Sequence, residues 1–251
     1  PVLEANLRGR TDIVYLTGGL INIVHQLIVR PDSGIEKPTD LRGRTVGIRT
    51  SKGGGLVDID AHLISSILPR IGLRNDEVKR RPIGHAHAKA VQALEAGEVD
   101  GVTLVEPYAA LAESRGLKRL VDSFELKIPF QLGGLVGNRK DIEANPELAK
   151  ALVRGFVESI HYIKNNRDRV VDIIVQYSEI PDRSVAEATY DAFVRYFHKV
   201  PYPSVQGMQA VLDLLVDLGV EKASSASPGD FIDASLLSDV EKEGFIDRLY
   251  Q

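Results

Sequence analysis

The middle of the chain alternates short apolar runs with segments in which apolar residues recur at helical spacing. The apolar runs are rich in β-branched residues and stop at Gly, Pro or charged residues, which is typical of strands. Strands are predicted over residues 45–49, 78–82, 99–105 and 117–122, and the run 99–105 is the most apolar of them. Helical patterns follow the first three runs, over residues 56–72, 85–97 and 109–115. Strands that alternate with helices predict an α/β fold with a parallel sheet and crossover helices.

The two ends of the chain carry different patterns. Strands are predicted over residues 12–16 and 26–30, before the central part. After residue 145 the chain is predicted to be mainly helical, and Asn145 caps a helix that has Pro146 at its first position. Later helices are expected over residues 168–177, 184–197 and 204–218. We expect the helix that starts at Pro146 to turn one apolar row inward: Leu148, Leu152, Phe156, Ile160 and Ile163.

Composition narrows the class of protein. The chain has 251 residues, of which 43% are hydrophobic and 26% charged, and its net charge is −4. These values are typical of a globular protein with a full core. The sequence has no basic block with interleaved aromatic residues, which argues against nucleic acid as a partner. It has no Cys, which excludes a disulfide, a thiolate zinc site and a cysteine nucleophile within these residues.

A glycine-rich stretch lies between the first central strand and its helix. Ser51, Lys52 and Gly53 begin a loop that continues with two more glycines and opens the next helix. A loop of this kind presents free backbone N–H groups beside the positive end of a helix dipole, which suits an anion. The alternative is a flexible helix entry without a ligand. The sequence matches neither the Walker A pattern nor the dinucleotide-binding glycine pattern, and it suggests no cofactor.

Four segments together resemble one protein family over nearly the whole chain. They are HQLIVRPDSGIEKPTDLRGRTVGI, VQALEAGEVDGVTLVEPYAALAESRG, VGNRKDIEANPELAKALVRGFVESIHYIKNN and the acidic helical tail. The chain is similar in these segments to the solute-binding proteins of ABC importers for nitrate, sulfonates, taurine and thiamine pyrimidines. The resemblance implies a type II periplasmic-binding-protein fold, in which two α/β lobes joined by a hinge close on a ligand.

The resemblance also implies a division into lobes. Residues 1–44 and 131–251 are expected to form lobe I, and residues 45–130 are expected to form lobe II, a parallel α/β unit. The family's first lobe opens with strand–helix units that have no counterpart before Pro1. We therefore expect lobe I to be partial, either because the sequence is a fragment, because a partner chain supplies those units, or because the site is incomplete.

Three functions are compatible with such a fold. The first is an extracytoplasmic receptor, in the periplasm or at the cell surface, that delivers a small organic solute to the membrane subunit of an ABC permease. It is expected to be a monomer with no catalytic residues and no metal, and no signal peptide is visible in this chain. The second is an enzyme on the same fold, either decarboxylase-like or similar to thiamine-pyrimidine synthases. The third is a sensory input domain that reads the solute.

Candidate ligand contacts follow the predicted strands, because open α/β sheets bind ligands beyond the carboxyl ends of their strands. Thr17 and Gly18 follow the first strand and offer a hydroxyl and bare backbone. A tight turn is the alternative there. Ser51, Lys52 and Gly53 follow the central strand, where they would meet a sulfonate, phosphate or carboxylate.

Three further candidates follow the later strands. His85 lies just before a predicted helix start, and Glu106 and Tyr108 follow the buried run 99–105. Glu106 would accept a hydrogen bond from an amine, or else cap the next helix. Tyr108 would stack on the ligand or donate its hydroxyl. Because Ser51 favours an anion and Glu106 favours a cation, the sequence leaves the charge of the solute open.

Overall fold

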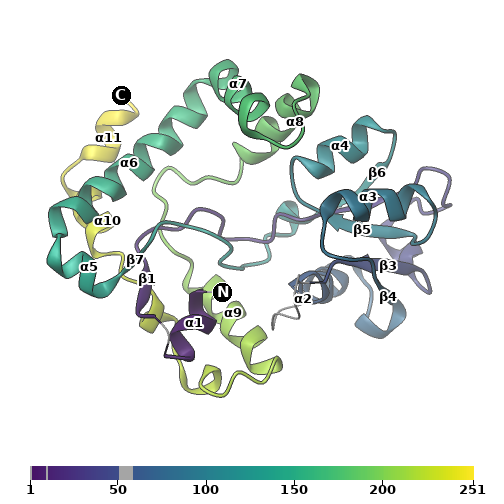
Figure 1. Cartoon of the computed structure of the whole chain (residues 1–251), viewed down its shortest axis with the longest axis horizontal. Helices are drawn as coiled ribbons and strands as arrows, with labels where there is room; N and C mark the ends of the chain where they lie inside the picture. Colours follow the sequence, from purple (N-terminus) through teal and green to yellow (C-terminus); the bar gives the residue numbers. More distant parts are fainter. Residues whose placement is uncertain (1, 10, 51–58) are drawn as a thin grey trace. The chain divides into compact units, whose positions relative to one another are not determined.

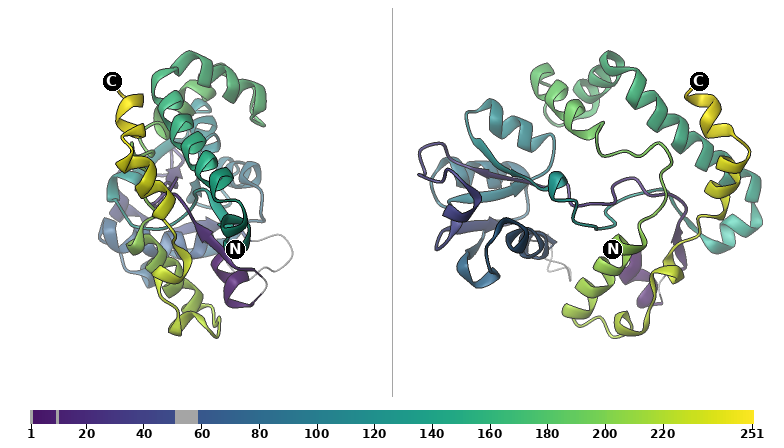
Figure 2. Two further views of the ribbon diagram at one scale, coloured as in Figure 1. Left: turned by 90° about the vertical axis from the view of Figure 1, so that its left-hand side faces the viewer. Right: turned by 180° about the vertical axis from the view of Figure 1, so that it is seen from behind.

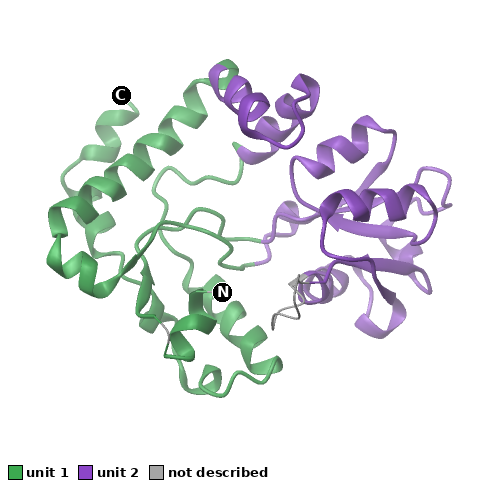
Figure 3. Ribbon diagram, in the orientation of Figure 1, with its two compact units in different colours: residues 1–22, 129–168, 194–251 green, residues 23–128, 169–193 purple. Residues whose placement is uncertain are grey.

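The computed structural model describes residues 2–9, 11–50 and 59–251. The chain divides into two compact units, shown in two colours in Figure 3. Unit 1 comprises Pro1–Asn22, Pro129–Asp168 and Val194–Gln251, and unit 2 comprises Ile23–Ile128 and Arg169–Phe193. The predicted glycine-rich contacts Ser51, Lys52 and Gly53 lie outside the described residues.

Unit 2 is built on a five-stranded sheet with the strand order β4-β3-β5-β2-β6 (Figure 1). The strands are β2 (Gln26–Val29), β3 (Thr45–Ile48), β4 (Lys79–Pro82), β5 (Gly101–Leu104) and β6 (Lys118–Asp122). Its helices are α2 (Ile59–Ile67), α3 (His87–Glu95), α4 (Tyr108–Ser114), α7 (Arg167–Tyr177) and α8 (Arg183–Phe193). The predicted α/β fold is thereby confirmed.

Four strands of this sheet run in one direction and β2 runs against them. β3 pairs with β4 and β5 in parallel, whereas β2 pairs antiparallel with both β5 and β6. All four residues of β2 are buried, so β2 belongs to the core of this unit. The predicted boundary at residue 45 assigned β2 to lobe I; the structure places it in unit 2, because both neighbours of β2 are in this sheet. Residues 169–193, expected in lobe I, also belong to unit 2.

Apolar side chains of α3 and α4 form one core with the sheet. β2 contributes Ile28 to this core, and β5 contributes Val102 and Leu104. The two helices contribute small and medium apolar residues, chiefly Ala90, Val91, Ala93, Leu94, Ala109 and Ala112. Because α4 is held by this core, its first residue, Tyr108, has a fixed place beside the carboxyl end of β5.

Unit 1 contains a two-stranded sheet surrounded by helices. β1 (Ile13–Tyr15) pairs antiparallel with β7 (Val136–Asn138). The helices are α1 (Val2–Leu7), α5 (Arg139–Ala144), α6 (Pro146–Asn165), α9 (Val205–Asp217), α10 (Ser235–Lys242) and α11 (Phe245–Leu249). Both views of Figure 2 show α6 and α10 side by side, and the two helices are in contact. Single 3-10 turns occur at Pro38–Leu41, Leu68–Ile71, Asn75–Glu77, Ser123–Leu126, Ala223–Ser225 and Pro228–Phe231.

The inward row of α6 differs from the prediction. Leu148 and Leu152 are 60% and 52% exposed. The fully buried row lies one residue further along the helix and consists of Ala149, Val153, Val157 and Ile160. Small and branched residues fit there because β1 and α10 approach this face closely, with Val14, Leu16, Leu237 and Val240 in the same core. The predicted Ile160 is buried, whereas at the start of the helix the buried positions are one residue, or about 100°, away from the predicted Leu148 and Leu152.

Two neighbouring substitutions on α6 are expected to differ in their effect on stability. Val153→Ala removes two buried methyl groups and should lower the free energy of unfolding by about 1.5 kcal/mol. Leu152→Ala removes a larger but exposed side chain and should cost less than about 0.5 kcal/mol. Urea denaturation of both variants measures the difference. A larger loss for Leu152→Ala would contradict the observed rotation of α6.

Candidate functional site

The carboxyl ends of three parallel strands meet at one edge of the sheet in unit 2. β3 is followed by Arg49, β4 by the loop that leads to His87, and β5 by Glu106. The antiparallel strand β2 starts at this same edge, because Gln26 pairs with Leu104, the last residue of β5. His25, which precedes β2, therefore joins the group. Edges of this kind are where open α/β sheets bind ligands.

A cavity of about 560 Å³ lies at this edge. Its size is within the range of small-molecule sites. Residues from the β4–α3 loop, from the β5–α4 connection and from the end of α7 form its walls: His85, Ala86, His87, Val105, Glu106, Pro107, Tyr108, Tyr177, Ser178 and Glu179. All of them belong to unit 2.

One wall rests on a nearly buried ion pair between Arg49 and Asp60. The two atoms Nη2 and Nε of Arg49 donate to the two carboxylate oxygens of Asp60, at 2.6 and 2.8 Å. The Asp60 side chain is only 1% exposed and that of Arg49 14%. A two-point contact of this kind fixes the orientation of the guanidinium group. Arg49 therefore acts as a rigid support at the end of β3.

Arg49 also fixes the tautomer of His87. Its Nη1 atom lies 2.7 Å from Nε2 of His87. Because a guanidinium group can only donate, Nε2 must accept, and the ring proton of a neutral His87 is on Nδ1. Burial, and then the charge of Arg49, lower the pKa of His87 to about 4. His87 is therefore neutral at physiological pH.

His25 is the second histidine at this edge. Its side chain is buried, and its Nδ1 atom has no hydrogen-bond partner. Burial lowers the pKa of His25 to about 3, and the nearby Arg49 and His87 lower it further in the same direction. A buried imidazole beside a permanent cation stays neutral because protonation would bury a second positive charge.

Tyr108 connects two walls of the cavity. Its ring stacks on the His87 ring, with the centroids 5.0 Å apart and the planes 12° from parallel. Its hydroxyl group donates a hydrogen bond to the carboxylate of Glu179, which follows α7. That hydrogen bond is the main reason that the pKa of Tyr108 is raised. This hydrogen bond links Tyr108 and Glu179, which are 71 positions apart in the sequence and line the same cavity.

Glu106 has a structural role at the start of α4. Its side chain is buried, and one carboxylate oxygen accepts a hydrogen bond from the Ala110 N–H at 2.8 Å. The other oxygen accepts from Arg119 at 3.1 Å. Burial raises the pKa of Glu106 in spite of these contacts. Glu106 thus satisfies the first turn of α4, the helix-capping alternative, and is also one of the residues that line the cavity.

The structure brings together three of the predicted contacts, since His85, Glu106 and Tyr108 line the same cavity. His85 is exposed, and the histidine that is tied into the edge is His87. The residues that the sequence analysis did not single out as ligand contacts are His87, Tyr177 and Glu179. The His85–His87 spacing was the one available signal for His87, whereas nothing in the sequence links Glu179 to this edge.

Thr17 and Gly18 belong to unit 1 and are used in its own packing. The Thr17 hydroxyl is fully buried and accepts a hydrogen bond from the Leu135 N–H at 3.0 Å. A Cβ atom at Gly18 would lie 2.4 Å from the carbonyl oxygen of Tyr202, so only glycine fits there. These contacts join Thr17 and Gly18 to distant segments of unit 1, at residues 135 and 202. A role of either residue in ligand binding stays a prediction.

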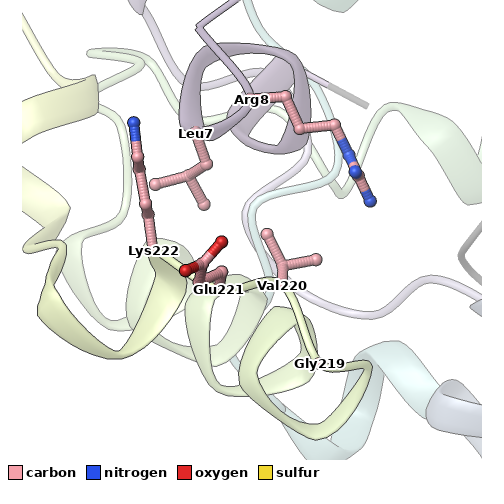
Figure 4. Close-up of a pocket in the computed structure, with 6 residues that line it drawn as sticks. All are labelled: Leu7, Arg8, Gly219, Val220, Glu221 and Lys222. Carbon is pink, nitrogen blue, oxygen red and sulfur yellow. The ribbon is translucent and has the colours of Figure 1, made fainter.

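Two cavities of unit 1 have fewer polar groups arranged for binding than the cavity of unit 2. One, of about 480 Å³, lies between α1 and the end of α9 (Figure 4). In Figure 4 the chains of Arg8 and Lys222 lie on opposite sides of it, and Arg8 is paired with Glu4. The other, of about 350 Å³, has a mainly apolar lining that includes Leu148 and Leu152. Neither cavity holds a buried polar network comparable to that around Arg49.

The described part of the chain contains no group of three or more His, Cys, Asp or Glu side chains that is arranged to hold a metal ion. None of the helices in residues 2–9, 11–50 and 59–251 combines the length and the apolar character that a membrane crossing demands.

Comparisons with known proteins identify a family and a fold. Residues 7–170 match the sequence family described as NMT1/THI5 like. No curated protein matches the chain. A similar structure is the periplasmic aliphatic sulphonate-binding protein SsuA from Escherichia coli, with 20% identity and a TM-score of 0.70 over 95% of this chain and 78% of that one.

Two more structures share the fold. The sulfonate-binding protein SsuA from Methylobacillus flagellatus KT, itself named as putative, has 18% identity and a TM-score of 0.67, covering 98% of this chain and 74% of that one. The desulfurization enzyme DSZB has 16% identity and a TM-score of 0.67, covering 97% of this chain and 83% of that one. At these identities the likeness establishes the fold, and the function has to be argued from the site.

Proposed function

Because this chain belongs to the NMT1/THI5-like family, we propose that it is an extracytoplasmic solute-binding protein that captures a small organic solute and delivers it to an ABC permease. The periplasmic sulfonate-binding proteins of the same fold support this role. The observation that carries the proposal is the cavity at the carboxyl edge of the unit 2 sheet. There the ring of Tyr108 stacks on His87, and His87 accepts a hydrogen bond from Arg49, which forms a nearly buried ion pair with Asp60. We further propose that the protein acts as a monomer.

Two polar groups at this edge, His87 and Glu106, are held by structural contacts, which favours binding over catalysis by these two residues. A general acid or base needs a free proton site within reach of the substrate. Nε2 of His87 is held by Arg49, and both carboxylate oxygens of Glu106 are held by Ala110 and Arg119. These contacts fix the positions of His87 and Glu106 and so preserve the shape of the cavity, as a receptor requires.

A thermal-shift screen tests the proposal. The panel contains sulfonates, nitrate, pyrimidines, aromatic carboxylates and amino acids. A solute at 100 times its Kd should stabilise the protein by about 2.7 kcal/mol, which raises the melting temperature measurably. The solute should be recovered unchanged. Turnover of a panel member would support an enzyme instead, and the absence of binding by every solute would refute the proposal.

A matched pair of tyrosine variants tests whether the solute binds at this cavity. Tyr108→Leu removes the ring that stacks on His87 and should weaken binding by about 10-fold. Tyr202→Leu is the control, because Tyr202 also donates to a glutamate, Glu241, but belongs to unit 1 and is not among the residues that line the cavity. Titration calorimetry with the strongest solute of the screen measures both. Equal affinities for the two variants would contradict binding at this cavity.

A further inference from the structure

We infer that the cavity at the carboxyl edge of the unit 2 sheet selects a solute group with a positive charge, and that Glu179 is its counterion. The solute is then a small organic cation or zwitterion whose ammonium or guanidinium group lies against Glu179 and the rings of Tyr108 and Tyr177. This inference rests on the proposed function, because it names the class of solute that the same site takes.

The first argument is the pairing of the cations around the cavity. Arg49 is matched by Asp60, with which it makes two contacts. Arg119 is shared between two carboxylates, since it donates to Glu106 at 3.1 Å and also to Glu113. Neither guanidinium group therefore carries excess positive charge toward a ligand. Around Arg119 there are two carboxylates for one guanidinium group, so this cluster has one more carboxylate than cations.

The second argument is that the buried histidines add no charge. His87 accepts from Arg49 through Nε2, so it stays neutral, and His25 is buried beside the same cation. A neutral imidazole offers no positive charge to an anionic ligand. The structure instead holds His87 as a neutral ring that supports Tyr108.

The third argument is the state of Glu179. It is exposed, and its carboxylate accepts a hydrogen bond from Tyr108. Among the described residues, no Lys, Arg or His side chain forms an ion pair with it within 4.0 Å. One carboxylate oxygen is positioned by Tyr108, and the other is available to a ligand. Among the described residues that line the cavity, Glu179 is thus the charged side chain without a counterion.

The fourth argument is the aromatic surface beside this carboxylate. Tyr108 and Tyr177 both line the cavity, and Tyr177 is 77% exposed. Faces of aromatic rings attract cations, and rings combined with a carboxylate are the usual way in which proteins hold organic ammonium groups. An anion at the same place would face the carboxylate of Glu179, which would repel it.

Calorimetric titration of the whole protein tests the inference. The cationic probes are choline, ethanolamine, putrescine and agmatine. The comparison probes are 3,3-dimethylbutan-1-ol, which is the neutral carbon isostere of choline, and ethanesulfonate, which is an anion. We expect at least one cationic probe to bind, and we expect the isostere and ethanesulfonate to bind at least about 10-fold more weakly.

Glu179→Gln is the decisive variant. The amide still accepts from Tyr108 but carries no charge, so the affinity for the cationic probe should fall by about 10-fold or more. Glu241→Gln is the matched control, because Glu241 also accepts from a tyrosine, Tyr202, in unit 1. It should leave the affinity unchanged. Far-ultraviolet circular dichroism and the melting temperature show whether both variants are folded.

The outcomes separate the two proposals. Loss of cation binding in Glu179→Gln and not in Glu241→Gln supports the inference. Binding of ethanesulfonate or another anion, with no cationic probe bound, overturns the inference and leaves the solute-binding function intact. Cation binding that survives in Glu179→Gln also overturns it. If no solute of either charge binds, the solute-binding proposal fails as well.

Discussion

Replacing Arg49 by Met is expected to lower the free energy of unfolding by about 3 kcal/mol or more. The reason is that Asp60 would keep its charge in a site where its side chain is only 1% exposed. Removing one partner of a buried ion pair costs far more than the pair itself contributes, since the remaining charge loses its two-point contact with a cation. Urea denaturation at pH 7 measures the loss.

An exposed ion pair is the control for this variant. Arg74 pairs with Asp76 at 3.0 Å, and both side chains are more than 70% exposed. Arg74→Met should therefore cost less than about 1 kcal/mol, because exposed pairs are solvated and screened. Similar losses for the two variants would mean that the Arg49–Asp60 pair does not support the edge of the sheet.

The same variant has a second readout at His87. Arg49 is the cation that fixes Nε2 as an acceptor and helps to lower the pKa of His87 to about 4. Without it, the pKa of His87 should rise toward the ordinary value of a histidine, and both tautomers should become populated. Titration of the His87 ring by NMR follows this change. An unchanged pKa would show that burial alone keeps His87 neutral.

Acid is expected to destabilise the protein through His25 well before the carboxylates titrate. The pKa of His25 is lowered from 6.5 to about 3 in the folded protein, chiefly by burial. In the unfolded chain His25 is protonated as the pH falls through 6.5, whereas in the folded protein it stays neutral until the pH approaches 3. The stabilisation is thus complete above pH 6.5 and is lost as the pH falls toward 3. Between pH 7.5 and 5, His25 alone should cost about 2 kcal/mol.

The His25→Leu variant isolates this contribution. Leucine fills a similar volume and has no titrating group, so the variant should lose about 2 kcal/mol less than the parent protein between pH 7.5 and 5. The parent's remaining pH dependence includes a contribution of similar size from His87, whose pKa is lowered to about 4 in the folded protein. His198→Gln is the control, because His198 is exposed. Parallel pH curves for the parent and His25→Leu would contradict the burial of a neutral His25.

The local pattern of the sequence was enough to predict most elements of unit 2. The runs at 45–49 and 117–122 became β3 and β6, and the helical spacing after residue 85 became α3. The carboxyl ends of these strands follow from their parallel order, and this is why His85, Glu106 and Tyr108 were predicted beside one another. Periodicity and strand direction are local properties, so one sequence reveals them.

The sequence did not reveal the rotation of α6 or the sheet to which β2 belongs, because both depend on contacts between residues far apart in the chain. The rotation of α6 was set by the close approach of β1 and α10, which buries Val153 and leaves Leu152 in solvent. β2 joined the unit 2 sheet because its edges pair with β5 and β6.

The sequence by itself thus determined the family, the α/β fold and the edge of the sheet at which to look. The tertiary structure decided the chemistry of that edge. It brought Glu179 to Tyr108 and joined Arg49 to both Asp60 and His87. The physical reason is that the charge state of a side chain is set by its neighbours in space, and these neighbours come from elements far apart in the chain.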